Sequence, residues 1–265
     1  MRRIHLFEFE DQTWFPSFLR NYITDFLQFL SNKAKVYQPV VDVISSTLKT
    51  GHTSTIIDLG SGGGGGLLWL SDELKKINPA LQIILTDLYP NIDAFEYTRQ
   101  KSSVFEYFPH PVDVKNVPEN LKGLRTQFLS FHHFNPDDAR MILQNAVNAN
   151  QPMAIFEIQY RSFPSFIAML LSPVSVLFTT PFIRPFRIGR LVFTYVIPVI
   201  PLVVLWDGIV SCLRTYSVDE MKALVDSLDN KKSYSWQFDK KEIKDRICYV
   251  YDWNSYINYW HCCSC

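Results

Sequence analysis

The chain has 265 residues, with 26 Lys and Arg against 26 Asp and Glu, so its formal net charge is zero; 15% of its residues are aromatic. This composition excludes a disordered chain, which would be poor in aromatics and rich in charge. It also provides no basic surplus for general binding to nucleic acid, so we expect no nucleic-acid partner. The length is sufficient for one large domain with a substantial core.

The N-terminal residues and the cysteines indicate a cytoplasmic protein. Acidic Glu8 and Glu10 interrupt the apolar stretch that a secretory signal requires. Two of the five cysteines are isolated and three crowd residues 262–265, which is no disulfide framework and suits a reducing compartment. The crowded cysteines lack the usual spacing of zinc ligands, so we expect a functionally silent tail and no metal site.

Two helices are predicted before the first strand. Apolar residues recur at helical spacing over residues 15–30, with Ser17 as a candidate N-cap, and a second helix is predicted over residues 38–48. Residues 1–50 are therefore expected to form an N-terminal helical lid.

From residue 54, strand patterns alternate with helical patterns. The predicted strands are residues 54–59, 81–86, 104–108, 123–131 and 153–160, and the intervening helices are residues 67–77, residues 92–101 and a helix that Asn135 caps. Five strands separated by helices predict a parallel sheet with helices on both faces.

The soluble pattern resumes after residue 206. Ser217 and Glu220 form a predicted capping box for a further helix. Residues 234–238 and 246–253 are then predicted to be two strands joined by a charged turn over residues 239–245.

A run of five glycines, residues 62–66, directly follows the first strand and opens a helix. Glycine is destabilising inside either element, but at a strand-to-helix turn it lets a ligand approach the backbone N–H groups closely. One matching pattern is the dinucleotide fingerprint G-x-G-x-x-G, with an acid about twenty residues later for the ribose. Gly60, Gly62, Gly65 and Asp87 satisfy it.

The same loop satisfies a second pattern, acid-x-G-x-G-x-G, at Asp58, Gly60, Gly62 and Gly64. This pattern resembles motif I of class I S-adenosylmethionine-dependent methyltransferases. The acid two positions before the first glycine favours this resemblance, because a dinucleotide loop usually has an apolar residue there.

The resemblance implies S-adenosyl-L-methionine as the cofactor. It implies contacts from the ends of strands two and three as well, with Asp87 on the ribose hydroxyls and Asp113 near the adenine amino group; Leu88 and Val114 stand beside them.

The resemblance also implies the fold class. This is an α/β Rossmann-like fold with a seven-stranded, mostly parallel sheet and helices on both faces, whose last strand is antiparallel. The cofactor-binding core would span residues 51–162, and residues 207–265 would complete the sheet. An apolar helical insertion after strand five would occupy residues 163–206.

His132 and His133 are the predicted catalytic residues. Methyl transfer from a sulfonium mainly requires proximity and orientation, and a base assists when the acceptor must lose a proton. The two histidines follow strand four, at the edge where open α/β sheets bind ligands. A structural role for one of them is the alternative, and Glu157 and Arg161 are further candidates.

The apolar segment, residues 163–206, has only three charged residues: Arg184, Arg187 and Arg190. A membrane-spanning hairpin would carry these arginines to the far side, against the positive-inside tendency. Two other interpretations stay open: docking into one leaflet with the arginines at anionic head groups, and an apolar cap over the substrate. Asp207, which follows the segment, is a candidate to face the pocket.

Both open interpretations predict a hydrophobic small molecule or lipid as methyl acceptor, and the first adds peripheral membrane contact through residues 163–206. The sequence thus predicts a cytoplasmic methyltransferase, and it does not specify an oligomeric state. The alternatives are a catalytically inactive, membrane-associated binding protein with this fold and an NAD-dependent oxidoreductase.

Overall fold

The computed structural model describes residues 1–231, 234–243 and 246–255, with side chains described up to residue 238. The cysteine-rich tail lies outside the described residues. Cys212 lies inside them and is buried as a free thiol.

A seven-stranded sheet has the strand order β3-β2-β1-β4-β5-β7-β6. β1 to β5 run parallel, and β7 pairs antiparallel with both β5 and β6. The strands are β1 (Thr55–Leu59), β2 (Gln82–Thr86), β3 (Phe105–Tyr107), β4 (Leu124–Phe128), β5 (Met153–Glu157), β6 (Tyr234–Ile243) and β7 (Arg246–Ser255). The five predicted parallel strands and the antiparallel last strand are confirmed.

The charged turn predicted over residues 239–245 is wrong for residues 239–243, because β6 continues to Ile243, and residues 244–245 lie outside the described residues. β6 is an edge strand paired with β7 along its length. Charged residues are common on edge strands, where they discourage pairing with other chains, so they do not by themselves mark a turn.

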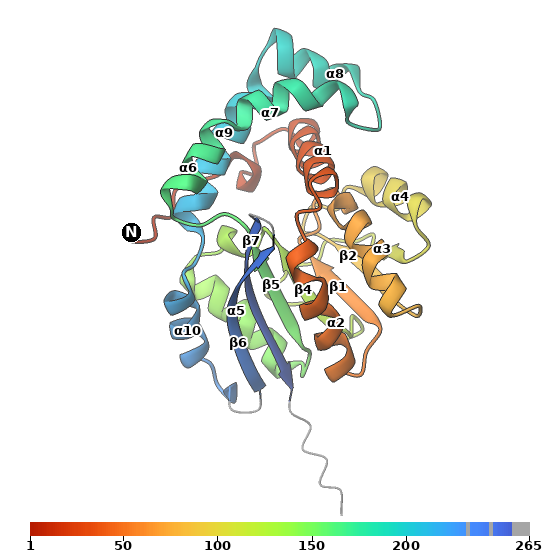
Figure 1. Ribbon diagram of the computed structural model, residues 1–265, viewed down its shortest axis with the longest axis vertical. Helices are drawn as coiled ribbons and strands as arrows, with labels where there is room; N and C mark the ends of the chain where they lie inside the picture. Colours follow the sequence, from red (N-terminus) through yellow and green to blue (C-terminus); the bar gives the residue numbers. More distant parts are fainter. Residues whose placement is uncertain (232–233, 244–245, 256–265) are drawn as a thin grey trace, which may run out of the picture.

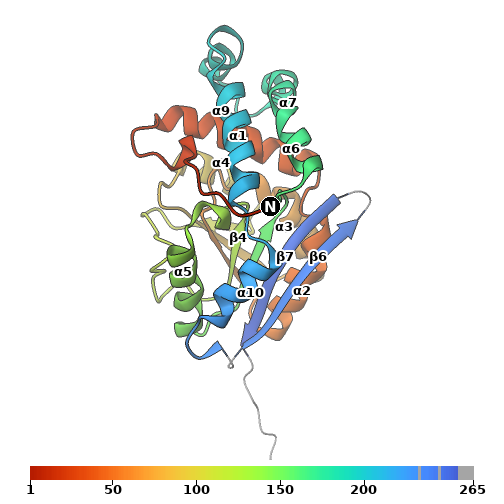
Figure 2. The same ribbon diagram turned by 90° about the vertical axis from the view of Figure 1, so that its left-hand side faces the viewer.

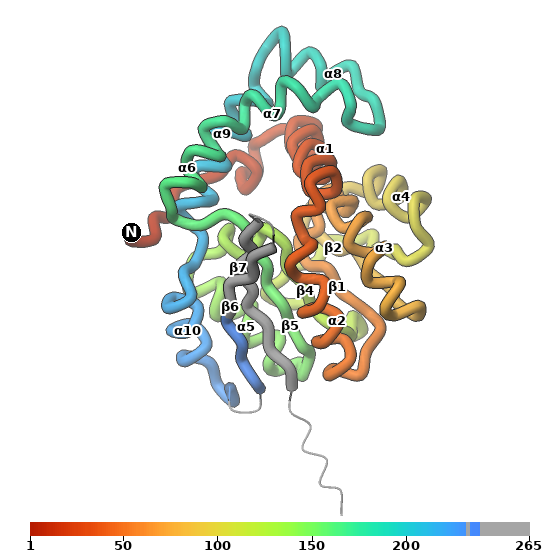
Figure 3. Tube along the Cα trace, in the orientation of Figure 1, coloured from red at the N-terminus to blue at the C-terminus, as the bar shows by residue number. Residues whose placement is uncertain are grey.

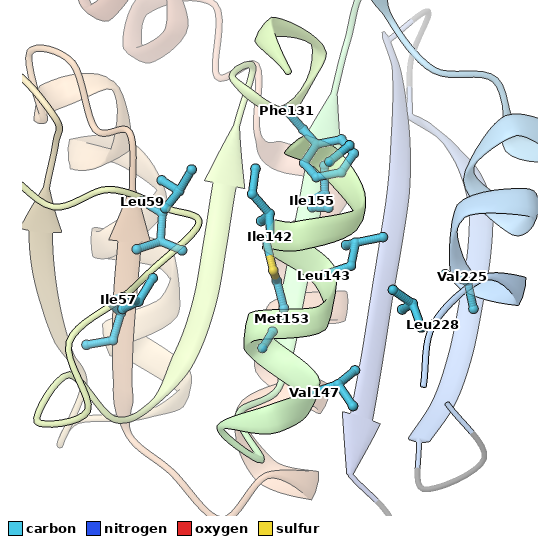
Figure 4. Packing of buried hydrophobic residues seen from close by; sticks show 14 of the residues in the cluster. Ile57, Leu59, Phe131, Ile142, Leu143, Val147, Met153, Ile155, Val225 and Leu228 are labelled. Atoms are coloured by element: carbon cyan, nitrogen blue, oxygen red, sulfur yellow. The ribbon is translucent and has the colours of Figure 1, made fainter. Parts of the chain in front are cut away.

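Two hydrophobic clusters bury the two faces of the sheet. α5 (Pro136–Asn148) and α10 (Val218–Asp226) pack on one face, where Ile142 and Val225 belong to the same cluster as Ile57 (Figure 4). On the other face lie α2 (Val41–Thr50), α3 (Leu68–Ile77) and α4 (Ile92–Lys101), packed against Ile56. Consecutive residues of a strand point to opposite faces, which is why Ile56 and Ile57 serve different clusters.

Helix starts follow the predicted chemistry at two of three positions. The Asn135 side chain accepts a hydrogen bond from the Asp138 N–H, and Ser217 and Glu220 form the predicted capping box. Ser17 is not the N-cap of α1 (Ser17–Lys33), because Pro16 occupies that position in an extended conformation. The carbonyl of Pro16 accepts the N–H groups of residues 19 and 20, so the helix starts one residue earlier than predicted.

The apolar segment forms a helical hairpin that continues beyond it. Its elements are α6 (Phe163–Leu170), α7 (Ser172–Thr179), the 3₁₀ turn η5 (Thr180–Phe182), α8 (Ile188–Leu191), the π-helical turn η6 (Val192–Val196) and α9 (Val199–Arg214). The boundary predicted between residues 206 and 207 falls inside α9. Figures 1 and 2 show the hairpin rising above the carboxyl ends of the parallel strands, with α1 beneath it.

Candidate active site

The glycine loop has the backbone geometry that its sequence suggests. Gly60, Gly62 and Gly64 adopt φ angles of +71°, +55° and +70°, a region that other residues rarely occupy. At Gly64 a side chain would also meet the side chain of Leu85 at 2.6 Å. The loop therefore leaves bare backbone at the carboxyl end of β1.

α1 covers this loop and is fixed to it. The Gln28 side chain fills the space that a side chain on Gly65 would need. Asn32 donates a hydrogen bond to the Gly65 carbonyl and accepts one from the Trp69 N–H at 2.8 Å. These contacts place one face of α1 opposite the glycine loop.

Two acids frame the loop from neighbouring strands. Asp87, after β2, accepts the N–H groups of Gly62 and Tyr89, each at 2.8 Å. Burial raises its pKa, and these hydrogen bonds act in the opposite direction. Asp58, at the end of β1, accepts the Thr126 hydroxyl at 3.0 Å, and burial raises its pKa to about 7.

A cavity of about 490 Å³ opens between the loop, α1 and the N-terminal segment. This volume lies within the usual range of small-molecule sites. All eight residues predicted to bind a cofactor line it: Asp58, Gly60, Gly62, Gly64, Asp87, Leu88, Asp113 and Val114. They meet because the carboxyl ends of parallel strands share one edge of the sheet. Their binding role remains a prediction.

Charged residues line another part of the cavity wall: His5, Glu10, Asp11, Arg20, His133 and Arg214. We call this group the polar end. Apart from His133, its members come from the N-terminal segment, from α1 and from the last residue of α9. Of the aromatic residues in the N-terminal 50 residues, Tyr37 lines the cavity, whereas Phe15 belongs to the core between α1 and the hairpin.

His132 lies behind the cavity wall. It is buried, and its Nδ1 lies 3.0 Å from Glu157 Oε2, while its backbone N–H donates to Glu157 Oε1 at 3.0 Å. Glu157 thus positions this imidazole, and Arg161 pairs with Glu220 instead of facing a ligand. The structural role that the sequence left open for one histidine fits His132.

His133 lines the cavity as a cation. Its Nδ1 lies 2.7 Å from Asp11 Oδ1 and 3.0 Å from Glu8 Oε2. Burial alone would lower the pKa of His133, but the two carboxylates outweigh it and raise the pKa to about 10. At neutral pH this imidazolium supplies positive charge and cannot accept a proton. The catalytic role predicted for the two histidines stays a prediction.

The N-terminal segment, residues 3–11, binds along α9 (Figure 3). The Phe9 N–H donates to Asp207 Oδ1 at 2.8 Å, and Arg214 Nη1 donates to Asp11 Oδ2 at 2.6 Å. Asp207 is therefore buried beneath this segment and is not among the residues that line the cavity.

Glu10 lines the cavity but was not among the site residues predicted from the sequence. Its Oε1 is buried and has no hydrogen-bond partner within the described part of the chain. Burial and the nearby charge of Asp207 raise the pKa of Glu10 to about 8. A signal was present on α9, where Asp207, Ser211 and Arg214 form a polar stripe at helical spacing on an otherwise apolar helix.

Glu8 lies between the two histidines, so these three residues could reach one metal ion. Arg214 Nη1, however, lies 3.4 Å from Glu8 Oε1. This guanidinium already balances the carboxylate charge, so the donor set favours an internal ion-pair network over a cation site.

No protein-family model and no curated protein matches the sequence. Among solved structures, the chain is similar to the plantazolicin methyltransferase BpumL in complex with SAH, with a TM-score of 0.52 and 13% identity over 91% of this chain and 88% of that one. It also matches an O-methyltransferase family protein from Burkholderia thailandensis, with a TM-score of 0.48 and 17% identity over 86% of this chain and 59% of that one. The first similarity, together with the observed strand order, shows that the chain has the fold of class I S-adenosylmethionine-dependent methyltransferases.

Proposed function

We propose that this protein is a methyltransferase that uses S-adenosylmethionine. The proposal rests on one observation: all eight residues expected to bind this cofactor line the same cavity. Its fold neighbour BpumL, whose structure is in complex with SAH, supports the same cofactor. A dinucleotide-binding enzyme is a weaker match, because its usual strand order 3-2-1-4-5-6 lacks the antiparallel β7 between β5 and β6.

The residues present fit the cofactor. The Asp87 carboxylate is already oriented by two backbone N–H groups, and its oxygens can accept further bonds from ribose hydroxyls. The glycine loop offers bare backbone beside it, and Asp113 would meet the adenine. When bound, the cofactor supplies an activated methyl group on a sulfonium sulfur.

Glu10 is the proton acceptor in this proposal. Its ionised carboxylate would take the proton from an O–H or N–H of the methyl acceptor. The lone pair of that oxygen or nitrogen would form the new bond to the methyl carbon, while the bond from this carbon to the sulfonium sulfur breaks, its electron pair stays on sulfur, and SAH leaves. His133 and Arg214, both cationic, would orient the acceptor oxygen or nitrogen and stabilise negative charge that develops on it.

The acceptor is proposed to be a hydrophobic small molecule or lipid that carries its reactive atom on a polar head. The polar end of the cavity suits such a head. None of residues 163–206, all of which are described, lines the cavity. The apolar segment is thus better placed to hold the rest of an amphiphilic molecule outside the cavity than to cap its mouth.

The test is transfer of label from methyl-labelled S-adenosylmethionine to a total lipid extract. We expect label in the organic phase, and we expect Glu10→Gln to reduce it strongly while SAH binding is retained. If the protein binds SAH but transfers no label to organic or aqueous acceptors of the extract, the inactive binding protein becomes the better account.

A further inference from the structure

The apolar segment exposes an unusual number of large apolar side chains for a protein surface. Fifteen of them lie within residues 163–206: Phe163, Ile167, Leu170, Leu171, Val174, Leu177, Phe178, Phe182, Phe186, Ile188, Tyr195, Val196, Ile197, Leu202 and Trp206. Isolated apolar residues are normal on a surface, but a concentration of this kind marks a contact with another protein or a membrane.

Together, α6, α7 and η5 form one helical stretch, Phe163–Phe182, which is long and apolar enough to cross a membrane. Only 17% of its most apolar part is buried. Low burial distinguishes it from a core helix of similar composition. The second half of the hairpin, Ile188–Val196 with Val199–Arg214, bends by 77°.

The tip of the hairpin is fixed to α1, which argues against a spanning hairpin. Arg190 is buried and pairs with Asp25 of α1 at 2.5 Å. Gly189 packs so closely against Tyr22 of α1 that a side chain there would clash. Since α1 also holds the glycine loop through Gln28 and Asn32, crossing a bilayer would require either breaking these contacts or carrying the cofactor loop into lipid.

The charge of the tip indicates the kind of surface that it meets. Residues 163–206 contain no acidic residue. Arg184 is exposed beside the exposed Phe182 and Phe186, and its guanidinium lies 5.9 Å from the centre of the Phe186 ring. Apolar side chains interleaved with arginine are typical of segments that lie in the interface of an anionic membrane.

We infer that the hairpin docks into one leaflet of an anionic bilayer, with its exposed apolar face in the lipid and the exposed Arg184 at the head groups. Docking itself does not depend on methyl transfer. Its consequence for the substrate, that an acceptor is taken from the same leaflet, rests on the proposed function.

The experiment is co-sedimentation of the full chain with vesicles of phosphatidylcholine, either pure or with phosphatidylglycerol added. We expect binding to the anionic vesicles and weaker binding to the neutral ones. Phe178→Ser with Phe182→Ser removes side chains that are 74% and 66% exposed and should weaken vesicle affinity at least about tenfold. Arg184→Glu should weaken binding to anionic vesicles by about fivefold per unit of charge.

The control variants replace other exposed residues, on helices outside the hairpin. Ile77→Ser with Met141→Ser alters side chains that are 54% and 51% exposed on α3 and α5, and Lys49→Glu reverses an exposed charge on α2. These variants should bind vesicles as the wild type does. SAH binding, measured on every variant, shows that the fold is intact and separates failure of docking from failure of the proposed function.

Three results would overturn the inference. The wild type could remain in the supernatant with both kinds of vesicle, or the control pair could lose as much affinity as the phenylalanine pair. A dimer in solution that Phe178→Ser with Phe182→Ser dissociates, without vesicle binding, would show that a second copy covers this face.

Discussion

Glu10 places a carboxylate at the polar end of the cavity, and one oxygen of this carboxylate has no hydrogen-bond partner among the described residues. The proposed role of Glu10 makes activity depend on pH. A carboxyl group accepts a proton only when ionised, and the pKa of Glu10 is raised to about 8. The rate should therefore rise with pH and level off above about 8 under saturating cofactor.

Glu10→Gln should lower kcat by about 10²- to 10⁴-fold, the usual contribution of a general base, and should abolish this rising limb. The exposed Glu119→Gln serves as the control and should keep the wild-type profile. If Glu10→Gln leaves both the rate and the pH profile unchanged, Glu10 has no part in the mechanism.

On the other side of the cavity, Asp87 is predicted to bind the ribose hydroxyls of the cofactor. Asp87→Ala should weaken SAH binding by about ten- to a hundredfold, since hydrogen bonds to a charged group contribute about 1.5–3 kcal/mol. Titration calorimetry measures this, with the exposed Asp72→Ala of α3 as control. Equal affinity in the two variants, with both folded, would mean that the ribose acid lies elsewhere.

At the scale of elements, the Arg190–Asp25 pair joins α8 to α1. Arg190→Ala leaves a buried carboxylate without its partner and should lower the free energy of unfolding by about 3–5 kcal/mol. The double variant Asp25→Leu with Arg190→Met removes both charges and should recover much of this loss.

Denaturant unfolding measures this effect. Arg99→Ala, which removes one partner of a solvent-exposed pair with Glu96, is the control and should change the stability little. If Arg190→Ala proves as mild as that control, the hairpin is not fastened to α1 through this pair.

Elements with local signals were predictable from the sequence. Asn135 and the Ser217–Glu220 box mark helix starts by hydrogen bonds within one turn, and the strand patterns of β1 to β5 follow from burial on both faces. The extent of β6 was not predictable, because pairing with β7 extends the strand over residues whose charges suggest a turn.

At the scale of the whole molecule, the two ends of the cavity differ in how far sequence could predict them. The eight cofactor residues follow three parallel strands and reach one edge by topology alone. At the polar end, Arg214 binds Asp11 across about two hundred residues; the polar stripe on α9 indicates a polar contact there but does not identify its partners. Glu10 was therefore visible only once the chain was folded.

The small share of charged residues, 20% of the chain, is not spread evenly over the structure. Charged residues are scarcest in residues 163–206, which form most of the hairpin that projects from the carboxyl edge of the sheet and which contribute no side chain to the cavity. The molecule thus separates a polar cavity from an apolar surface, with α1 packed between them.

The most direct test of the central claim is titration calorimetry of the wild-type protein with S-adenosylhomocysteine and, separately, with NAD. The account predicts saturable one-to-one binding of S-adenosylhomocysteine and no heat of binding with NAD. Binding of NAD without binding of S-adenosylhomocysteine would contradict it and make the chain a nicotinamide-dependent protein.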